Sequence, residues 1–181
     1  MIPAFTGILA PHGLATSFES IATVTVGAGG SSTVSFSSIP STYQHLQIRA
    51  TFFQTAGTTK EALLTFNGVS LASYTTHQLY GNGSSAGAYA ATGLTYTYIG
   101  QSSGTNLYTG VSITDILDYQ DTNKYKTVRS LWGWDANGSG QVFLSSGLYS
   151  ANTNAITSIT ITQSSSSFAQ YSSFALYGVK A

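Results

Sequence analysis

The sequence predicts an all-β domain, either a sandwich or a closed barrel. From residue 21 onward, apolar and polar residues alternate with a period of two, the pattern of strands that bury one face. Clusters of Gly, Asn and Ser interrupt the alternation at intervals of roughly 8–15 residues, as turns between short strands do. No segment carries a convincing apolar stripe with the helical period. These observations predict about eight to ten strands.

The composition indicates one well-packed domain with a weakly charged surface. The chain has 181 residues, of which 42% are hydrophobic, 13% aromatic and only 7% charged, while Ser and Thr fill over a quarter of the positions. The formal net charge is zero, which argues against nucleic acid or an anionic membrane as a partner. The absence of cysteine excludes disulfides and thiolate zinc sites. A surface with so little self-repulsion suits a subunit of an assembly.

The first half of the chain predicts two hairpins around one well-patterned strand. Residues 21–26 and 33–36 are separated by a Gly-rich turn and are expected to pair. Residues 45–53 alternate with Leu46, Ile48, Ala50 and Phe52 on the core face. Residues 62–66 run into Asn67-Gly68, which favours a two-residue hairpin to the next strand.

The second half predicts strands between Gly-rich and Ser-rich loops. Residues 81–88 and 100–106 have loop composition. Further strands are expected over 107–119, 124–134, 141–149, 155–162 and 173–179. The first two of these are predicted to form a hairpin that turns at residues 120–123.

Residues 1–20 break the pattern and are predicted to be an extended arm on a sandwich of residues 21–181. Pro3, Gly7, Pro11 and Gly13 prevent a regular helix or a central strand. Six large apolar side chains lie between them: Ile2, Phe5, Ile8, Leu9, Leu14 and Phe18. Such a segment cannot bury these side chains by itself, so we expect the arm to be an assembly interface.

Half of the twelve charged side chains lie within residues 115–129, namely Asp115, Asp118, Asp121, Lys124, Lys126 and Arg129. The spacing of the acids does not fit a calcium loop, and Asp115 and Asp118 would face opposite sides of a strand, which disfavours a glycosidase pair. We expect a hairpin clamped by Asp118 and Asp121 with Lys124 and Lys126. A site for an anionic partner is the alternative.

No cluster in the sequence has the spacing of a catalytic or metal site. His12, His45 and His77 are far apart and lack a second ligand nearby in the sequence, so structural or solvent-exposed roles are expected. There is no G-x-S-x-G elbow and no phosphate-binding loop followed by a helix. We therefore expect no catalytic residues, no metal and no cofactor.

Trp132 and Trp134 share one side of their strand with Val128, which favours core packing. The alternative is a sugar-binding platform made by Trp134, Asp135 and Asn137 near a loop.

Several stretches together resemble small virion structural proteins of tailed bacteriophages, especially phages of aquatic bacteria. They are SFESIATVTVG, SSTVSFSSIPSTYQHLQIR, ITDILDYQDTNKYKTVRSLWG, NGSG, LSSGLY, AITSITI and SSFALYGVK, and they span most of the chain from Ser17 to Lys180. The resemblance implies a jelly-roll-like sandwich without catalytic residues, often assembled as a homotrimer. It implies no active-site residue.

The expected function is that of a capsid decoration or cement protein on the outer surface of the phage particle. Its expected partners are the major capsid protein and copies of itself. The alternative is a tail-fibre or tail-tip module that binds host glycans, although the sequence shows no fibre shaft. An enzyme such as a depolymerase has the least support.

Overall fold

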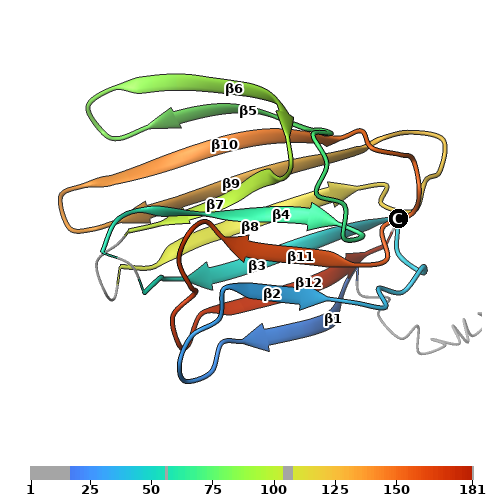
Figure 1. Ribbon diagram of the computed structural model, residues 1–181, viewed down its shortest axis with the longest axis horizontal. Coiled ribbons are helices and arrows are strands. Elements are labelled where there is room, and N and C mark those ends of the chain that lie inside the picture. Colours follow the sequence, from blue (N-terminus) through green and yellow to red (C-terminus); the bar gives the residue numbers. More distant parts are fainter. Residues whose placement is uncertain (1–16, 56, 104–107, 181) are drawn as a thin grey trace, which may run out of the picture.

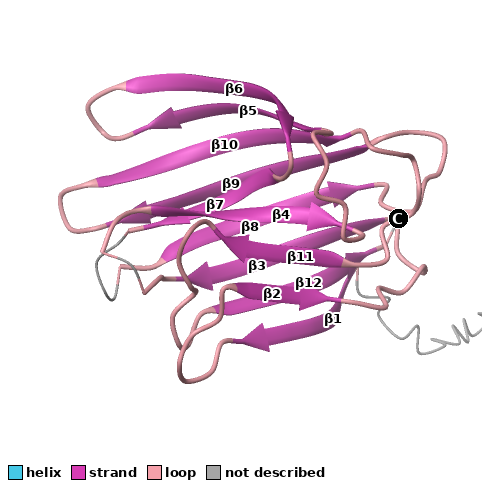
Figure 2. Cartoon of the chain, in the orientation of Figure 1, coloured by secondary structure: helices cyan, strands magenta, loops and turns pink. Residues whose placement is uncertain are grey.

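The computed structural model describes residues 17–55, 57–103 and 108–180. These residues form twelve β-strands and no helix (Figure 2). The strands are β1 Phe18–Thr25, β2 Thr33–Phe36, β3 His45–Phe52, β4 Lys60–Phe66, β5 Tyr74–Gly81, β6 Ala86–Leu94, β7 Thr97–Ser102, β8 Gly110–Leu117, β9 Lys126–Asp135, β10 Gly140–Tyr149, β11 Ile159–Gln163 and β12 Ser173–Val179.

The strands form two antiparallel sheets packed face to face (Figure 1). The large sheet has the order β1-β12-β3-β8-β9-β10-β5-β6, and the small sheet has the order β2-β11-β4-β7. The predicted sandwich is therefore confirmed. There are twelve strands instead of the expected eight to ten. The two segments of loop composition, residues 81–88 and 100–106, overlap the start of β6 and the end of β7, which pair with β5 and β4.

Eight of the strands follow the jelly-roll order. The large sheet contains β1-β12-β3-β8, and the small sheet contains β2-β11-β4-β7, so early strands alternate with late ones in both sheets. The other four strands arise from two inserted hairpins, β5-β6 between β4 and β7, and β9-β10 between β8 and β11. Both insertions extend the large sheet beyond β8, and Figure 1 shows them stacked above the rest of the sandwich.

The core lies between the two sheets. Phe52, Phe168 and Phe174 pack with ring centroids 4.7–5.7 Å apart at its centre. A second aromatic group, formed by Phe66, Tyr74 and Tyr149, has centroids 5.0–6.4 Å apart. Each of these six side chains is fully buried. Burial of this many rings supplies the hydrophobic stabilisation that the composition predicts.

Two predicted hairpins are wrong because their strands pair with other, more distant strands. β1 joins β12 in the large sheet, whereas β2 joins β11 in the small sheet. Asn67 and Gly68 do form a tight turn with φ angles of 51° and 69°. After that turn, however, β4 pairs with β7 and β11, and β5 pairs with β6 and β10. Pairing between distant segments overrides the local turn signal.

The strand and hairpin expected in the middle of the chain are confirmed. In β3, Leu46, Ile48, Ala50 and Phe52 are buried as the alternation predicts. β8 pairs with β9 from Gly110 opposite Trp134 to Leu117 opposite Thr127.

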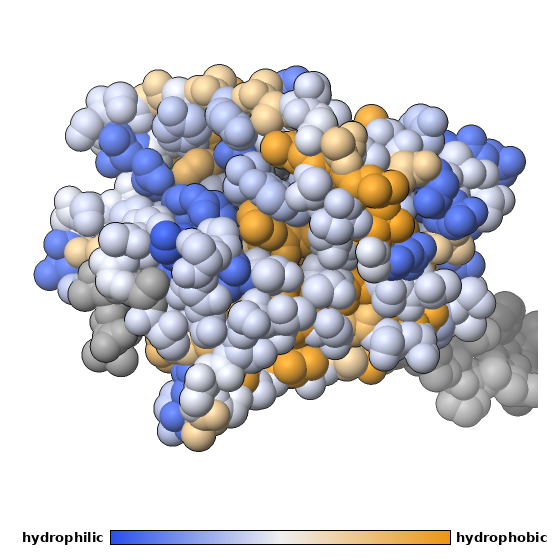
Figure 3. All heavy atoms as spheres, viewed as in Figure 1, coloured by the Kyte–Doolittle hydropathy of each residue, from blue (hydrophilic) through white to orange (hydrophobic). Residues whose placement is uncertain are grey.

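The boundary between the arm and the sandwich differs from the predicted one. β1 begins at Phe18 and pairs with β12 from that residue, so residues 18–20 belong to the sandwich and not to an arm of residues 1–20. Figure 3 views the molecule as in Figure 1 and shows a surface of mostly intermediate hydropathy, in keeping with the low charge content.

Candidate functional site on the outer face of the large sheet

The outer face of the large sheet carries a row of exposed aliphatic side chains. Ile113 on β8 is directly opposite Leu131 on β9, Leu131 is opposite Leu144 on β10, and Leu144 is opposite Leu79 on β5. Their exposed fractions are 45%, 53%, 50% and 62% in that order. We call these four residues the apolar row. Side chains in such directly opposite positions lie close enough to form one continuous surface.

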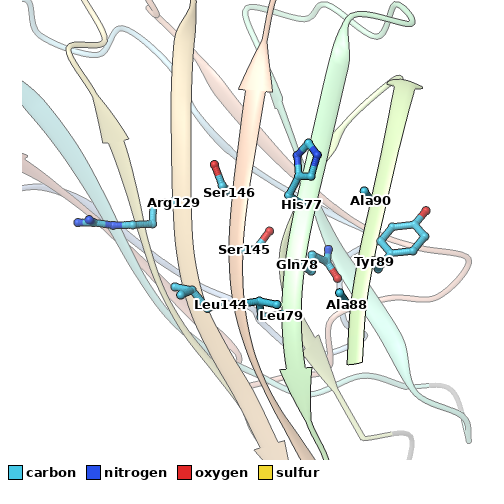
Figure 4. A pocket seen from close by; sticks show the side chains of 10 residues that line it. All are labelled: His77, Gln78, Leu79, Ala88, Tyr89, Ala90, Arg129, Leu144, Ser145 and Ser146. Carbon is cyan, nitrogen blue, oxygen red and sulfur yellow. The ribbon is translucent and has the colours of Figure 1, made fainter. Parts of the chain in front are cut away.

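The apolar row lies in a trough that crosses the sheet. Beside it, Val111 and Val142 are also about half exposed, and Gly133 lies between them in the pairing register. Two hollows of about 600 and 500 Å³ follow the row, the first toward β5 and β6 and the second toward β3 and β8. Figure 4 shows Leu144 and Leu79 side by side in the first hollow. Gly133 adds no side chain between the two valines, and its backbone packs closely on β10, where an added Cβ would lie 2.8 Å from the Gln141 backbone oxygen.

Behind the row, the inner face of the same strands is lined by hydroxyl groups. Thr114 Oγ1 and Ser130 Oγ lie 2.9 Å apart, and Thr76 Oγ1 and Ser145 Oγ lie 3.3 Å apart. All four residues are buried. The usual alternation is thus inverted here, since hydroxyls bonded in pairs face the other sheet while aliphatic side chains face outward. The inversion occurs on β5, β8, β9 and β10, and it leaves an apolar surface exposed on this face.

A chain of polar contacts borders the row on one side. Arg129 Nη2 donates to Asp115 Oδ2 at 3.0 Å, and Gln47 Nε2 donates to Asp115 Oδ1 at 2.8 Å. Arg49 Nε donates to Gln47 Oε1 at 2.8 Å, and its guanidinium lies 5.2 Å from the Tyr177 ring centroid and 5.5 Å from that of Phe18. These contacts fix the charged groups beside the row and leave the row itself uncharged.

The charged turn between β8 and β9 contains part of the predicted clamp. Lys124 Nζ donates to Asp118 Oδ2 and lies 3.5 Å from Asp121 Oδ2. The Lys124 hydrogen bond holds the pKa of the Asp118 carboxyl below its usual value. The Asn123 backbone amide has the same effect on the pKa of Asp121. Asp115 takes no part in this clamp because it pairs with Arg129 across the sheet.

Lys126 is not part of an exposed clamp, and this corrects the sequence-based expectation. The side chain is fully buried, and its ammonium group donates to the backbone oxygens of Asp121, Lys124 and Thr153. Burial lowers the pKa of this ammonium, while the nearby charge of Asp121 opposes the change. Its position explains the difference, since Lys126 lies on the inner face of β9 together with Val128. Lys126 therefore ties the turn to the loop before β11.

The two tryptophans have different environments. Trp132 is buried and stacks on Phe143 at 3.6 Å between centroids. Trp134 is half-buried, and its indole nitrogen donates to Gln101 Oε1 at 3.0 Å. Trp134 and Asp135 line a shallow hollow of about 340 Å³ together with Asn82 and Gly83 from the turn between β5 and β6. Asn137, with φ of 54°, lies in the neighbouring turn, where its backbone amide donates a hydrogen bond of 2.8 Å to Asp135 Oδ1.

The remaining predicted residues divide between the described and undescribed parts of the chain. Ile2, Phe5, Ile8, Leu9, Leu14 and His12 lie outside the described residues. Phe18 lies in β1, with its ring near Arg49. His45 Nδ1 accepts a hydrogen bond of 2.8 Å from the Asp118 backbone amide, and His77 is exposed in the first hollow of the trough. Within residues 17–55, 57–103 and 108–180, no three His, Cys, Asp or Glu side chains come together to hold a metal ion.

Sequence reasoning missed the apolar row. Its four residues come from four strands and become neighbours only through the pairing of the inserted hairpins. A signal was nevertheless present. In Val111-Ser-Ile113-Thr and in Ser130-Leu131, aliphatic residues alternate with hydroxyl residues, so either face could have been the buried one.

No helix long and apolar enough to cross a membrane occurs in the described part of the chain. Comparison with protein-family models, with curated proteins and with solved structures finds no match to this chain.

Proposed function

We propose that this protein is a non-enzymatic structural subunit of a phage virion, a decoration or cement protein on the outer surface of the head. It binds the major capsid protein and copies of itself, most simply as a homotrimer. Its role is to stabilise the capsid by covering surface between capsomers. It needs no cofactor, nucleic acid or membrane for this role.

The observation that carries the proposal is the exposed apolar row. A monomer in water gains nothing from placing Leu131, Leu144 and Leu79 outward, each half-exposed or more, while hydroxyls occupy the inner face. A protein surface that covers the row would recover about 25 cal/mol for each Å² of apolar area removed from water. The row also runs across four strands, which suits a protein segment better than a small solute.

Two further features support the same role. The jelly-roll order of the strands recurs in viral capsid domains, which is an argument from fold analogy. The resemblance of the sequence to virion proteins points the same way. Of the charged side chains on the outer face, Arg129 is paired with Asp115, and Arg49 donates to Gln47 and lies beside the Tyr177 ring. A partner that covers the apolar row itself therefore buries no unpaired charge.

Immunogold electron microscopy tests the proposal on phage particles whose genome encodes this chain. Antibody raised against the purified protein is expected to label heads evenly, and mass spectrometry of the same particles is expected to detect the chain in many copies. Particles that lack the chain entirely would refute a virion role.

The second candidate function is that of a tail-fibre or tail-tip module that binds host glycans. The hollow beside Trp134 and Asp135 favours it, because an aromatic ring next to polar turn residues is a common setting for a sugar. Label confined to tail tips would support this function. Glycan binding by the purified protein would also support it, if Trp134→Ala abolishes the binding. Tyr171→Ala, a change at an exposed ring elsewhere, is the control and should leave the binding intact.

A further inference from the structure

The trough on the large sheet needs an occupant that is apolar, narrow and uncharged. Its floor is the apolar row, flanked by Val111 and Val142. Its border carries Arg129, which is paired with Asp115, and Arg49, which donates to Gln47. A charged group placed on the row itself would lose its hydration without gaining an ionic partner, because the four side chains of the row are aliphatic.

We propose that the trough binds residues 1–16 of a neighbouring copy of this chain. The inference rests on the proposed role as an assembly subunit and identifies one contact between the copies. Residues 1–16 contain no Asp, Glu, Lys or Arg, and they include Ile2, Phe5, Ile8, Leu9 and Leu14. Their chemistry therefore complements an uncharged aliphatic floor. Pro3 and Pro11 disfavour a regular helix in this sequence, which favours binding as an extended segment in the trough.

The length of the segment is sufficient for this contact. The apolar row occupies four adjacent strands, which at about 4.8 Å between strands spans roughly 14 Å from Ile113 to Leu79. Sixteen extended residues reach about 50 Å at roughly 3.3 Å per residue. The segment can therefore cross the gap between two copies and still cover the whole row.

The geometry where the segment begins favours a neighbouring copy over the same copy. The Lys180 backbone amide donates to the Ser17 oxygen at 3.0 Å, so the chain at Ser17 still follows the direction of β1 along β12. Phe18 pairs opposite Val179, and Val179 is opposite His45, so this point lies at the end of the sheet. The row lies further inside, level with Arg49, which is opposite Ile113. A segment that continued in this direction would leave its own sheet, whereas the row of a neighbouring copy can lie in its path.

Cysteine cross-linking tests the contact, because the chain has no native cysteine. Three full-length variants are made: Leu9→Cys in the segment, Leu144→Cys in the row, and Ser35→Cys as a control at an exposed position of the small sheet. Leu9→Cys protein is mixed with mass-tagged Leu144→Cys protein and, separately, with mass-tagged Ser35→Cys protein under mild oxidation. We expect a mixed disulfide dimer with Leu144→Cys that exceeds the Ser35→Cys product by at least about tenfold.

Equal cross-linking to both positions, or none to Leu144→Cys, would overturn the inference. A chain carrying both Leu9→Cys and Leu144→Cys that forms only an intrachain disulfide would also overturn it, because the segment would then cover its own row. Sedimentation supplies a second measurement: Leu144→Asp and Leu9→Asp should each weaken self-association at least about tenfold, whereas Ser35→Asp should not. Head labelling without the cross-link would leave the virion role standing and remove this contact alone. If the cross-link forms but particles are not labelled, the contact between copies stands and the virion role is refuted.

Discussion

Lys126 Nζ lies 2.9 Å from the backbone oxygen of Thr153, and this hydrogen bond joins β9 to the loop between β10 and β11. The same ammonium donates to the backbone oxygens of Asp121 and Lys124 in the turn before β9. One buried charge thus satisfies three carbonyl groups from two segments that have no strand pairing of their own. A lysine in this position acts as a structural tie and not as a surface charge.

Lys126→Met should therefore destabilise the fold by about 2–4 kcal/mol. Methionine retains the length and apolar character of the stem but leaves three carbonyl oxygens without their donor. The measurement is chemical denaturation, with Lys124→Met as the control. Lys124 is half-exposed, so we expect its removal to change the midpoint little. Equal effects of the two variants would contradict the role assigned to Lys126.

The buried hydroxyl of Tyr74 leads us to expect that the protein loses stability at alkaline pH. Its hydroxyl accepts from the Phe66 backbone amide at 2.9 Å and donates to the Val69 oxygen at 3.0 Å, so it holds the Asn67-Gly68 turn. Burial raises the pKa of Tyr74 to about 12. The unfolded chain therefore releases this proton first, and the stabilisation present below pH ~10 is lost as pH rises toward ~12, by about 2–3 kcal/mol.

Unfolding free energies measured in steps from pH 9 to 12 check this prediction. Tyr74→Phe should be less stable than the unmodified protein at pH 9, because it lacks both hydrogen bonds, and should lose less stability on the way to pH 12. Tyr171→Phe, a change at an exposed ring, serves as the control and should follow the unmodified protein. Parallel curves for all three proteins would rule out Tyr74 as the titrating group.

Gly178 is needed because the Tyr43 ring packs directly on β12. A Cβ atom at this position would lie 2.2–2.4 Å from carbons of that ring. The ring cannot easily move, since the Tyr43 hydroxyl donates to Glu19 Oε2 at 3.0 Å and the Tyr43 backbone oxygen accepts from Gln120. Gly178→Ala should therefore cost about 1–3 kcal/mol.

Gly27→Ala is the matched control, because no atom lies within 4 Å of a Cβ built there. Combining Gly178→Ala with Tyr43→Ala removes the clash, so the double variant should be more stable than the sum of the two single effects predicts. Thermal or chemical unfolding of the four proteins measures this coupling. Simple additivity would show that the contact is not the cause.

Sequence patterns predict what is local in this fold and miss what is distant. The alternation of β3 and the β8-β9 hairpin follow directly from short stretches, because a strand with one wet face and one dry face has a period of two. The pairing of β1 with β12 joins Phe18 to Val179, and no local signal encodes it. The nearby Gly-rich turn therefore favoured the wrong hairpin.

The candidate site was hidden for a related reason. Ser130 and Thr114 satisfy each other across the strands, which makes it possible to bury hydroxyls and expose Leu131 and Ile113. Alternation alone cannot distinguish this arrangement from the opposite one. Lys126 was placed on the surface for a similar reason, because its three acceptors are backbone oxygens that no side-chain pattern reveals.

Trp132 and Trp134 are only two residues apart on the same strand face, but replacing each with alanine should lower the free energy of unfolding by different amounts. Trp132 is 3% exposed and stacks on Phe143, which in turn lies 5.4 Å from the Tyr80 ring, so Trp132→Ala removes the end of a buried aromatic stack. We expect a loss of about 3–5 kcal/mol. Trp134 is half-buried and makes one side-chain hydrogen bond, to Gln101, so Trp134→Ala should cost less, about 1–3 kcal/mol.

Fluorescence-monitored unfolding separates the two sites, because each variant retains one indole. The single tryptophan of the Trp134→Ala protein should emit at shorter wavelength than that of the Trp132→Ala protein, since Trp132 is the more buried ring. The Trp134→Ala protein should stay folded at room temperature, which makes it usable in the glycan-binding experiment. A Trp134→Ala protein as unstable as Trp132→Ala would mean that the Trp134 ring supports the core, and a binding defect in that variant would then be no evidence for a glycan site.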